Sequence, residues 1–167
     1  MRARFKREAQ AVAALDHPNI VRLVDFGVAQ LDEQAPYMVM ELVSGATSLR
    51  QVLADWRENP PTWKGVSEVF SQVLAGLDAA HERGIVHRDV KPDNVMCKKA
   101  KGYEWFVKVL DFGLAKTFDG VGASTPEMPS LTDAGAIVGT PQYMAPEQLS
   151  RAHFGPMDER VDLYAVA

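Results

Sequence analysis

The segment from His87 to Asn94 carries the side chains best suited to chemistry. It reads His-Arg-Asp-Val-Lys-Pro-Asp-Asn, so that Asp89 is followed by Lys91 and then by Asn94. Transfer of a phosphoryl group to a hydroxyl needs a carboxylate to accept the proton, a cation to stabilise the transferred group, and oxygen ligands for Mg²⁺. Since all three kinds of group occur together, the segment indicates a phosphoryl-transfer site rather than a charged turn.

Two later segments support this interpretation. Asp111-Phe112-Gly113 follows a predicted strand, which suits a carboxylate presented to a metal–phosphate site, and Gly113 would let the chain turn into a loop. The same triplet occurs early in the chain, at residues 25–27, where we interpret it as a strand end with a turn glycine. The third segment, Gly139 to Glu147, reads Gly-Thr-Pro-Gln-Tyr-Met-Ala-Pro-Glu and closes a loop rich in Gly, Ser, Thr and Pro.

Together these segments resemble the eukaryotic-type (Hanks-type) protein kinases, in particular the bacterial serine/threonine branch. The matching motifs are His87-Arg88-Asp89 with Asn94, Asp111-Phe112-Gly113 and Ala145-Pro146-Glu147, and they occur in the family's order. The resemblance covers essentially the whole chain. It implies an α+β, protein-kinase-like two-lobed fold that is incomplete at both ends. Residues 1–43 would form a partial N-lobe (helix C, two strands and the hinge). Residues 44–167 would form a partial, mostly helical C-lobe, from helix D to the start of helix F.

The resemblance also implies catalytic roles. Asp89 would be the catalytic base, Lys91 would contact the transferred phosphate, and Thr140 would contact both of these side chains. Asn94 and Asp111 would hold Mg²⁺. The lysine is typical of enzymes that act on serine and threonine, which argues against a tyrosine kinase. The implied cofactors are ATP and Mg²⁺, and the implied partner is a protein substrate with a Ser or Thr acceptor.

A second group of residues would bind the nucleotide. Glu8 resembles the glutamate of helix C, and Met40 resembles the gatekeeper. The backbone at Glu41 and Val43 would bond adenine, and Met96 resembles the apolar floor beneath it.

Regulatory and supporting roles follow in the same way. Arg88 resembles the arginine that receives a phosphate from the activation loop. Thr132 is the first choice for that phosphate among four candidate hydroxyls, the others being Ser124, Thr125 and Ser130. Asp162 resembles the helix F aspartate that holds the catalytic loop. Four residues would stack as a hydrophobic spine: Val12, Leu23, His87 and Phe112. The remaining histidines, His17, His81 and His153, are interpreted as turn or helix-surface residues.

Hydrophobic periodicity and turn residues predict the elements that position these groups. We expect helices over residues 4–15, 48–58 (capped by Ser48), 62–83 (ended by Gly84), 144–150 and 158–167. The buried face of the long helix should contain Val66, Val69, Phe70, Val73, Leu74, Leu77 and Ala80. Strands are expected over 20–26 and 37–42 as an antiparallel pair, the second nearly all apolar and therefore buried. Two more are expected over 94–97 and 105–110, separated by a polar turn over 98–103. Residues 117–139 should form a long loop.

Composition limits the remaining possibilities. The chain has 167 residues, 47% of them hydrophobic, and a net charge of −4. No basic field supports nucleic-acid binding, and no apolar run is long enough to span a membrane. The single cysteine, Cys97, cannot form an intramolecular disulfide. We therefore expect a cytoplasmic protein, or the cytoplasmic part of a membrane-anchored receptor kinase. Whether it dimerises for autophosphorylation is left open.

The family's pattern is not complete. The chain shows no Gly-rich phosphate loop, and the strand lysine expected upstream of helix C cannot be Lys6, which lies in the same predicted helix as Glu8. We therefore expect residues 1–167 alone to bind ATP poorly. One alternative is a catalytically inactive kinase-derived fragment or interaction module. Another is a small-molecule phosphotransferase of kinase-like fold, against which Lys91 and the Gly139–Glu147 segment argue.

Overall fold

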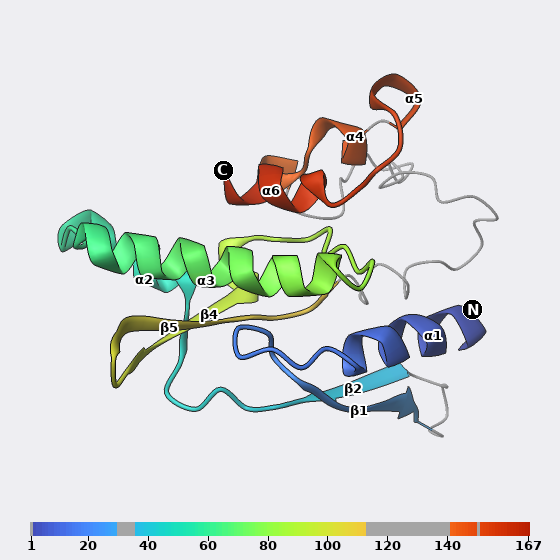
Figure 1. Ribbon diagram of the computed structural model, residues 1–167, viewed down its shortest axis with the longest axis horizontal. Helices are drawn as coiled ribbons and strands as arrows, with labels where there is room; N and C mark the ends of the chain where they lie inside the picture. Colours follow the sequence, from blue (N-terminus) through green and yellow to red (C-terminus); the bar gives the residue numbers. More distant parts are fainter. Residues whose placement is uncertain (1, 30–35, 113–140, 150) are drawn as a thin grey trace.

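The computed structural model describes residues 2–29, 36–112, 141–149 and 151–167 (Figure 1). At its N-terminal end, helix α1 (Arg2–Ala13) lies on a hairpin of strands β1 (Leu23–Val28) and β2 (Pro36–Met40). The strands are antiparallel, as predicted, and the structure places Leu23 opposite Met40 and Val28 opposite Pro36. Apolar side chains of α1 are buried at Ala9 and Val12. The predicted helix and strand pair are therefore confirmed, with bounds shifted by a few residues.

The expectation that β2 is buried is wrong. Tyr37 and Val39 are 40% and 46% exposed. Met38 and Met40 line a small cavity together with Val12 of α1, so they belong to the face toward the helix. Side chains alternate along a strand, and Tyr37 and Val39 therefore belong to the opposite face. An unbroken apolar run does not show which face is covered.

The next two helices begin within a residue of the predicted positions, and the first has the predicted cap, Ser48. Ser48 starts α2 (Leu49–Glu58) with a capping box, in which its hydroxyl accepts from the N–H of Gln51 and the Gln51 side chain accepts from the N–H of Ser48. Thr62 accepts from the N–H of Gly65 and starts α3 (Trp63–His81). Gly84 has φ of +70° and donates its N–H to the carbonyl of His81, which turns the chain away from the helix. These helices are predictable because their signals are local.

Helix α3 buries a narrower stripe than predicted. Val69, Val73, Leu77 and Ala80 are buried, but Phe70 and Leu74 are 37% and 40% exposed. Glycines complete the buried stripe instead. A Cβ at Gly76 would lie 3.0 Å from the carbonyl oxygen of Asn19, so glycine lets this segment approach the helix closely. The assignment of Phe70 and Leu74 to the buried face is wrong because α3 turns only this stripe toward the core.

A second sheet lies against α3. Its strand order is β3–β4–β5, formed by Thr47–Ser48, Val95–Ala100 and Tyr103–Val109, and neighbouring strands are antiparallel. The predicted polar turn over 98–103 is mostly strand, since Lys98 pairs with Phe106 and Ala100 with Tyr103. The lysines are accommodated because their ammonium groups lie over aromatic rings, as Lys99 does over Trp105 at 3.6 Å. Strand β3 was not predicted.

Side chains from elsewhere cover the outer edge of β5. Glu68 accepts hydrogen bonds from the N–H groups of Glu104 and Trp105, at 2.7 and 3.1 Å. Gln72 bonds the carbonyl of Trp105 and the N–H of Val107. These contacts satisfy an edge that would otherwise expose backbone donors and acceptors.

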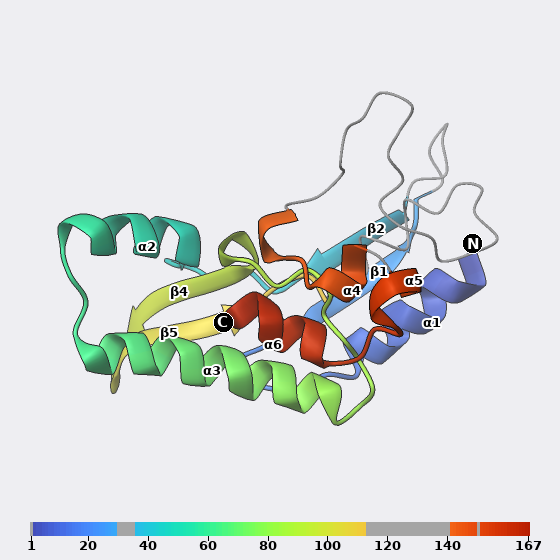
Figure 2. The same ribbon diagram turned by 90° about the horizontal axis from the view of Figure 1, so that it is seen from above.

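The C-terminal elements lie on the other side of α3. They are α4 (Pro146–Leu149), α5 (Arg151–Phe154) and α6 (Arg160–Val166). Figures 1 and 2 show α6 running beside α3, and in the view of Figure 1 the β4–β5 hairpin lies below α3 while α6 lies above it. The predicted helices over 144–150 and 158–167 are confirmed with shorter bounds, and the predicted loop lies within residues 113–140, outside the described residues. None of the helices in the described ranges has the length and apolarity to cross a membrane.

Candidate active site

The three groups of the His87–Asn94 segment lie together in the structure. Lys91 Nζ lies 2.7 Å from Asp89 Oδ2. The Asn94 side-chain amide donates to the backbone oxygen of Asp89 at 2.9 Å and to its Oδ2 at 3.1 Å. A 3₁₀ turn over Pro92–Asn94 folds the chain back and makes these contacts possible. The side chains of Asp89 and Lys91 are 26% and 22% exposed, so a substrate could reach them.

The backbone on both sides of the site has an uncommon conformation. Arg88 has φ of 65° and Asp111 has φ of 56°, and these are the two non-glycine residues with positive φ in the described ranges. Such conformations are unfavourable for residues with a Cβ and persist where the surrounding structure enforces them, often at functional sites. Both residues belong to segments that the sequence had indicated as chemical.

Asp162 of α6 enforces the conformation at Arg88. Its carboxylate is fully buried and accepts hydrogen bonds from the backbone N–H of His87 at 2.8 Å and of Arg88 at 2.7 Å. His81 Nε2 lies 2.8 Å from the same carboxylate. The interpretation of His81 as a surface residue is therefore wrong, because its side chain is only 13% exposed and lies where α3 meets α6. The expectation that Asp162 holds this segment is confirmed.

His87 joins the two chemical segments. Its Nδ1 accepts from the N–H of Asp89 at 3.2 Å, so its Nε2 carries the proton and donates to the carbonyl of Leu110 at 2.7 Å. Burial lowers the pKa of His87 by more than the nearby charge of Asp162 raises it, and the ring stays neutral. The N–H of Leu110 in turn donates to the carbonyl of Asn94. Asp111 is thereby held beside Asn94.

The predicted spine residues pack together. The rings of His87 and Phe112 are 4.7 Å apart, and Phe112 is 3% exposed. Val12 and Leu23 belong to the same buried cluster as Phe112. A cavity of about 80 Å³ between α1, the hairpin and Phe112 is lined by Met40 and Asp111 among others. The structure thus brings a predicted nucleotide-binding residue close to a predicted metal ligand.

Glu41 is tied to the second sheet. Its Oε1 accepts from Lys108 Nζ at 2.5 Å and from the N–H of Arg22 at 3.0 Å, while its own N–H donates to the carbonyl of Arg22. The carbonyl of Val43 accepts from Ala46. The backbone at Glu41 and Val43 was expected to bond adenine, and these contacts occupy the N–H of Glu41 and the carbonyl of Val43. Met96, the expected floor, is half-buried on β4.

Three predicted site residues cannot be compared with the structure in full. Glu8 lies within α1, and its side chain is outside the described part. Thr140 and Thr132 lie outside the described residues altogether.

Sequence reasoning missed two polar contacts around the site. Arg50 of α2 forms a bidentate ion pair with Asp93, with both N–O distances 2.6 Å. Gln148 of α4 donates to the carbonyl of Arg88 at 2.8 Å and accepts from the N–H of Ala145 at 3.0 Å. Neither has a sequence signal, because each is a single polar residue whose partner is brought near only by the fold.

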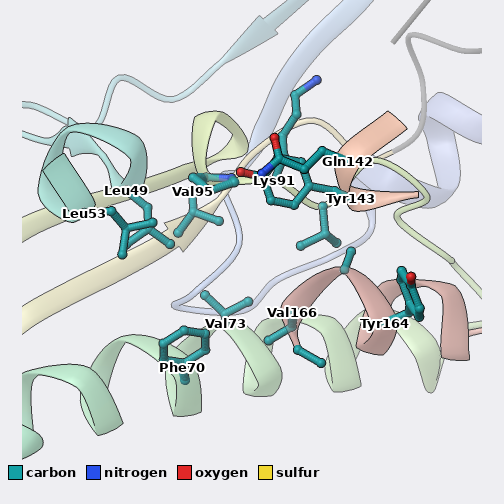
Figure 3. Close-up of a pocket in the computed structure, with 14 residues that line it drawn as sticks. Leu49, Leu53, Phe70, Val73, Lys91, Val95, Gln142, Tyr143, Tyr164 and Val166 are labelled. Carbon is teal, nitrogen blue, oxygen red and sulfur yellow. The ribbon is translucent and has the colours of Figure 1, made fainter. Parts of the chain in front are cut away.

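An apolar cavity of about 500 Å³ opens next to this cluster. Figure 3 shows its walls, with Leu49 and Leu53 from α2, Phe70 from α3 and Tyr164 from α6. Lys91, Gln142 and Tyr143 lie together at one side of it (Figure 3). The cavity therefore adjoins the site and takes half of its lining residues from helices α2, α3 and α6.

Comparisons with known proteins agree with this geometry. Residues 1–167 match the family model described as protein kinase domain. The chain is 46% identical over 164 residues to serine/threonine-protein kinase pkn3 of Myxococcus xanthus. The alignment covers 98% of this chain and 28% of that relative. The chain is 41% identical over 164 residues to serine/threonine-protein kinase PknB of Mycobacterium tuberculosis, again covering 98% of this chain, and 24% of that relative. The chain thus spans about a quarter of the length of these relatives.

Solved structures of protein kinases also resemble this chain. The crystal structure of a double mutant of the Mycobacterium tuberculosis PknI kinase domain superposes with a TM-score of 0.65 at 28% identity, covering 99% of this chain and 52% of that one. The crystal structure of Rad53 in complex with AMP-PNP gives a TM-score of 0.68 at 30% identity, covering 97% and 35% of the two chains.

Proposed function

This chain belongs to the protein kinase family, and on that premise we propose that it forms part of a protein serine/threonine kinase. The reaction transfers the γ-phosphate of ATP to serine and threonine hydroxyls of proteins. The observation that carries the proposal is the cluster of Asp89, Lys91 and Asn94, joined through the carbonyl and N–H of Leu110 to Asp111. The relatives named as serine/threonine kinases support the choice of acceptor.

The donor set of the site fits Mg²⁺ together with a nucleotide. In the described residues no group of three or more His, Cys, Asp or Glu side chains could hold a metal ion alone. Mg²⁺ is commonly bound by one or two protein oxygens plus substrate phosphates, which is what Asn94 and Asp111 offer. Because the nitrogen of the Asn94 amide donates to Asp89, its oxygen remains as the ligand. When bound, Mg·ATP supplies the phosphoryl group and a counter-charge for its oxygens.

The chain's own residues orient and deprotonate the acceptor. Lys91 and Asn94 both contact Oδ2 of Asp89 and so orient its carboxylate, which would bind the acceptor hydroxyl and accept its proton. Lys91 also places a positive charge where the phosphoryl group must arrive. The neutral ring of His87 fixes the backbone of Asp89 without adding a competing charge.

The nucleotide would lie between the hinge and β4. Glu41 and Val43 would bond adenine through backbone groups, with Met40 and Met96 on either side, and Glu8 would contribute from α1. Residues 1–43 would form the part of the N-lobe present here and residues 44–167 the part of the C-lobe. These assignments extend the family pattern to the positions that match it.

Regulation would act through Arg88. Its side chain is exposed, and its backbone is held by Asp162 and Gln148. A phosphate on Thr132 would add strong acceptors for this guanidinium, and Thr140 would bond Asp89 and Lys91. The protein would act in the cytoplasm, alone or as part of a longer receptor.

A phosphoryl-transfer assay tests the proposal. It uses the full natural polypeptide that contains these residues. With labelled ATP, Mg²⁺ and a mixed protein substrate, we expect label on serine and threonine. Asp111→Asn should abolish Mg²⁺-dependent nucleotide binding, measured by calorimetry. The matched control is Asp25→Asn. Asp25 begins the other Asp-Phe-Gly triplet, on β1, and this variant should bind the nucleotide normally. Label on tyrosine alone, or on small molecules alone, would contradict the proposal.

A further inference from the structure

Arg50 and Asp93 form an ion pair at the rim of the site. Arg50 Nε donates to Asp93 Oδ1 and Arg50 Nη2 donates to Oδ2, both at 2.6 Å. The two side chains are 51% and 43% exposed. The hydrogen bond from Arg50 is the main cause that lowers the pKa of Asp93, and the same bond, assisted by the nearby Tyr143 hydroxyl, raises the pKa of Arg50. Both groups are therefore charged under all ordinary conditions.

The pair lies close to the proposed catalytic base. Asn94 contacts Asp89, so the turn that contains Asp93 closes directly beside the base. Arg50 is in the first turn of α2, and its neighbour Leu49 lies across the cavity from Lys91, Gln142 and Tyr143 (Figure 3). One residue of extended peptide spans about 3.5 Å, so residues flanking the acceptor reach this rim.

The ion pair of Arg50 and Asp93 determines the charge that the rim presents to a substrate. Both oxygens of Asp93 accept from one guanidinium, so the exposed carboxylate of the segment is already neutralised. The two bonds use two of the five N–H groups of Arg50, and the nearby Tyr143 hydroxyl can accept from one more, so further N–H groups can still donate. A basic substrate side chain would have to displace Arg50 from Asp93, whereas an acidic one would meet available donors.

Resting on the proposed function, we propose that Arg50 is a specificity-determining residue that selects the acceptor protein by charge. It covers Asp93, excludes substrates with arginine or lysine next to the acceptor hydroxyl, and favours those with neutral or acidic neighbours. The substrate class is therefore proteins whose acceptor Ser or Thr lies in a neutral or acidic stretch.

The test uses the naturally encoded polypeptide and peptides that share one acceptor serine. Arg, Ala or Glu is placed in turn at each of about three positions on either side of it, a span that reaches roughly 10 Å. For the unaltered protein we expect kcat/KM to be lowest for the Arg peptides. In Arg50→Gln, the Arg-to-Ala ratio of kcat/KM should rise about fivefold or more at one or two positions, because Asp93 is uncovered. Asp93→Asn in the Arg50→Gln background should remove this gain.

A matched control and a second readout make the result decisive. Arg57→Gln removes the same charge from the last turn of the same helix and should leave the ratio unchanged. Peptide affinity is measured in parallel by fluorescence anisotropy, so the preference is read even if turnover is absent. An unchanged ratio in Arg50→Gln, or an equal change in Arg57→Gln, would overturn the inference. Failure of phosphoryl transfer to every peptide would count against the proposed function instead, and the affinity ratios would still decide the role of Arg50.

Discussion

The carboxylate of Asp162 accepts a hydrogen bond of 2.8 Å from the backbone N–H of His87, 75 residues earlier in the chain. Its other oxygen accepts from Arg88, whose φ of 65° is unfavourable for a residue with a side chain. A residue held in this way costs of the order of 1–3 kcal/mol, which the buried, charge-assisted hydrogen bonds offset. Helix α6 thereby fixes the backbone that leads into Asp89.

Replacing Asp162 with alanine should destabilise the protein strongly. The change leaves the buried N–H of His87 and the partly buried N–H of Arg88 without their acceptor, which we expect to cost about 2–4 kcal/mol in the free energy of unfolding. Urea denaturation of the natural polypeptide measures this. The control is Asp158→Ala, which removes an exposed acid just before α6 and should cost much less. Equal losses of unfolding free energy in the two variants would contradict the stabilising role given to the hydrogen bonds of Asp162.

The two leucines of α3 offer a test of its buried face. Leu77 is fully buried and Leu74 is 40% exposed, although their positions on the helix made both appear buried. We expect Leu77→Ala to cost about 2–5 kcal/mol because it opens a cavity in the core. Leu74→Ala should cost less than about 1 kcal/mol. Thermal and urea unfolding measure both, and a larger loss at Leu74 would contradict the packing described.

The ion pair of Glu41 and Lys108 predicts a dependence of stability on pH. Partial burial acts to raise the pKa of Glu41, but hydrogen bonds from Lys108 and from the N–H of Arg22 outweigh it and hold the pKa below its ordinary 4.5. A pKa that is lower in the folded state stabilises the protein above the unfolded value. The contribution is therefore complete above about pH 5 and is lost as the pH falls through the folded value.

Lys108→Met should remove this effect. We expect a loss of roughly 1 kcal/mol near neutral pH and a shallower fall of stability on acidification, because Glu41 then titrates closer to its ordinary value. Unfolding curves between about pH 3 and pH 7 test this window, since it brackets the titration of the carboxylate. Lys101→Met, which removes a lysine from the β4–β5 turn, should leave the slope unchanged. The same slope in Lys108→Met as in the unaltered protein would refute the role given to the pair.

Features with local signals were predictable from the sequence. The starts of α2 and α3 follow from Ser48 and Thr62, whose side chains cap the helices that directly follow them. The chemical cluster was predictable for the same reason, because Asp89, Lys91 and Asn94 come from one short segment. Its link to Asp111 required the family pattern, since the connecting contacts are made by the backbone of Leu110.

Features that depend on long-range packing were not predictable. The exposure of Tyr37 and Val39 depends on which face of β2 is covered, and an unbroken apolar run carries no such information. The sequence indicated a helix-surface position for His81, because the packing of α6 that brings Asp162 beside it has no local signal. Gln148 reaches the carbonyl of Arg88 across 60 residues, and no spacing rule connects them.

The central claim is that Asp89 is the base of a phosphoryl transfer to protein hydroxyls. The most direct test is the single-turnover rate of transfer from Mg·ATP to a serine peptide, for the unaltered protein and for Asp89→Asn. We predict a fall of about 10²–10⁴-fold, with nucleotide affinity unchanged, because the amide keeps the shape but cannot accept the proton. Asp16→Asn, an exposed acid after α1, should keep the full rate. An Asp89→Asn variant that transfers phosphate within a few-fold of the unaltered rate would contradict the account.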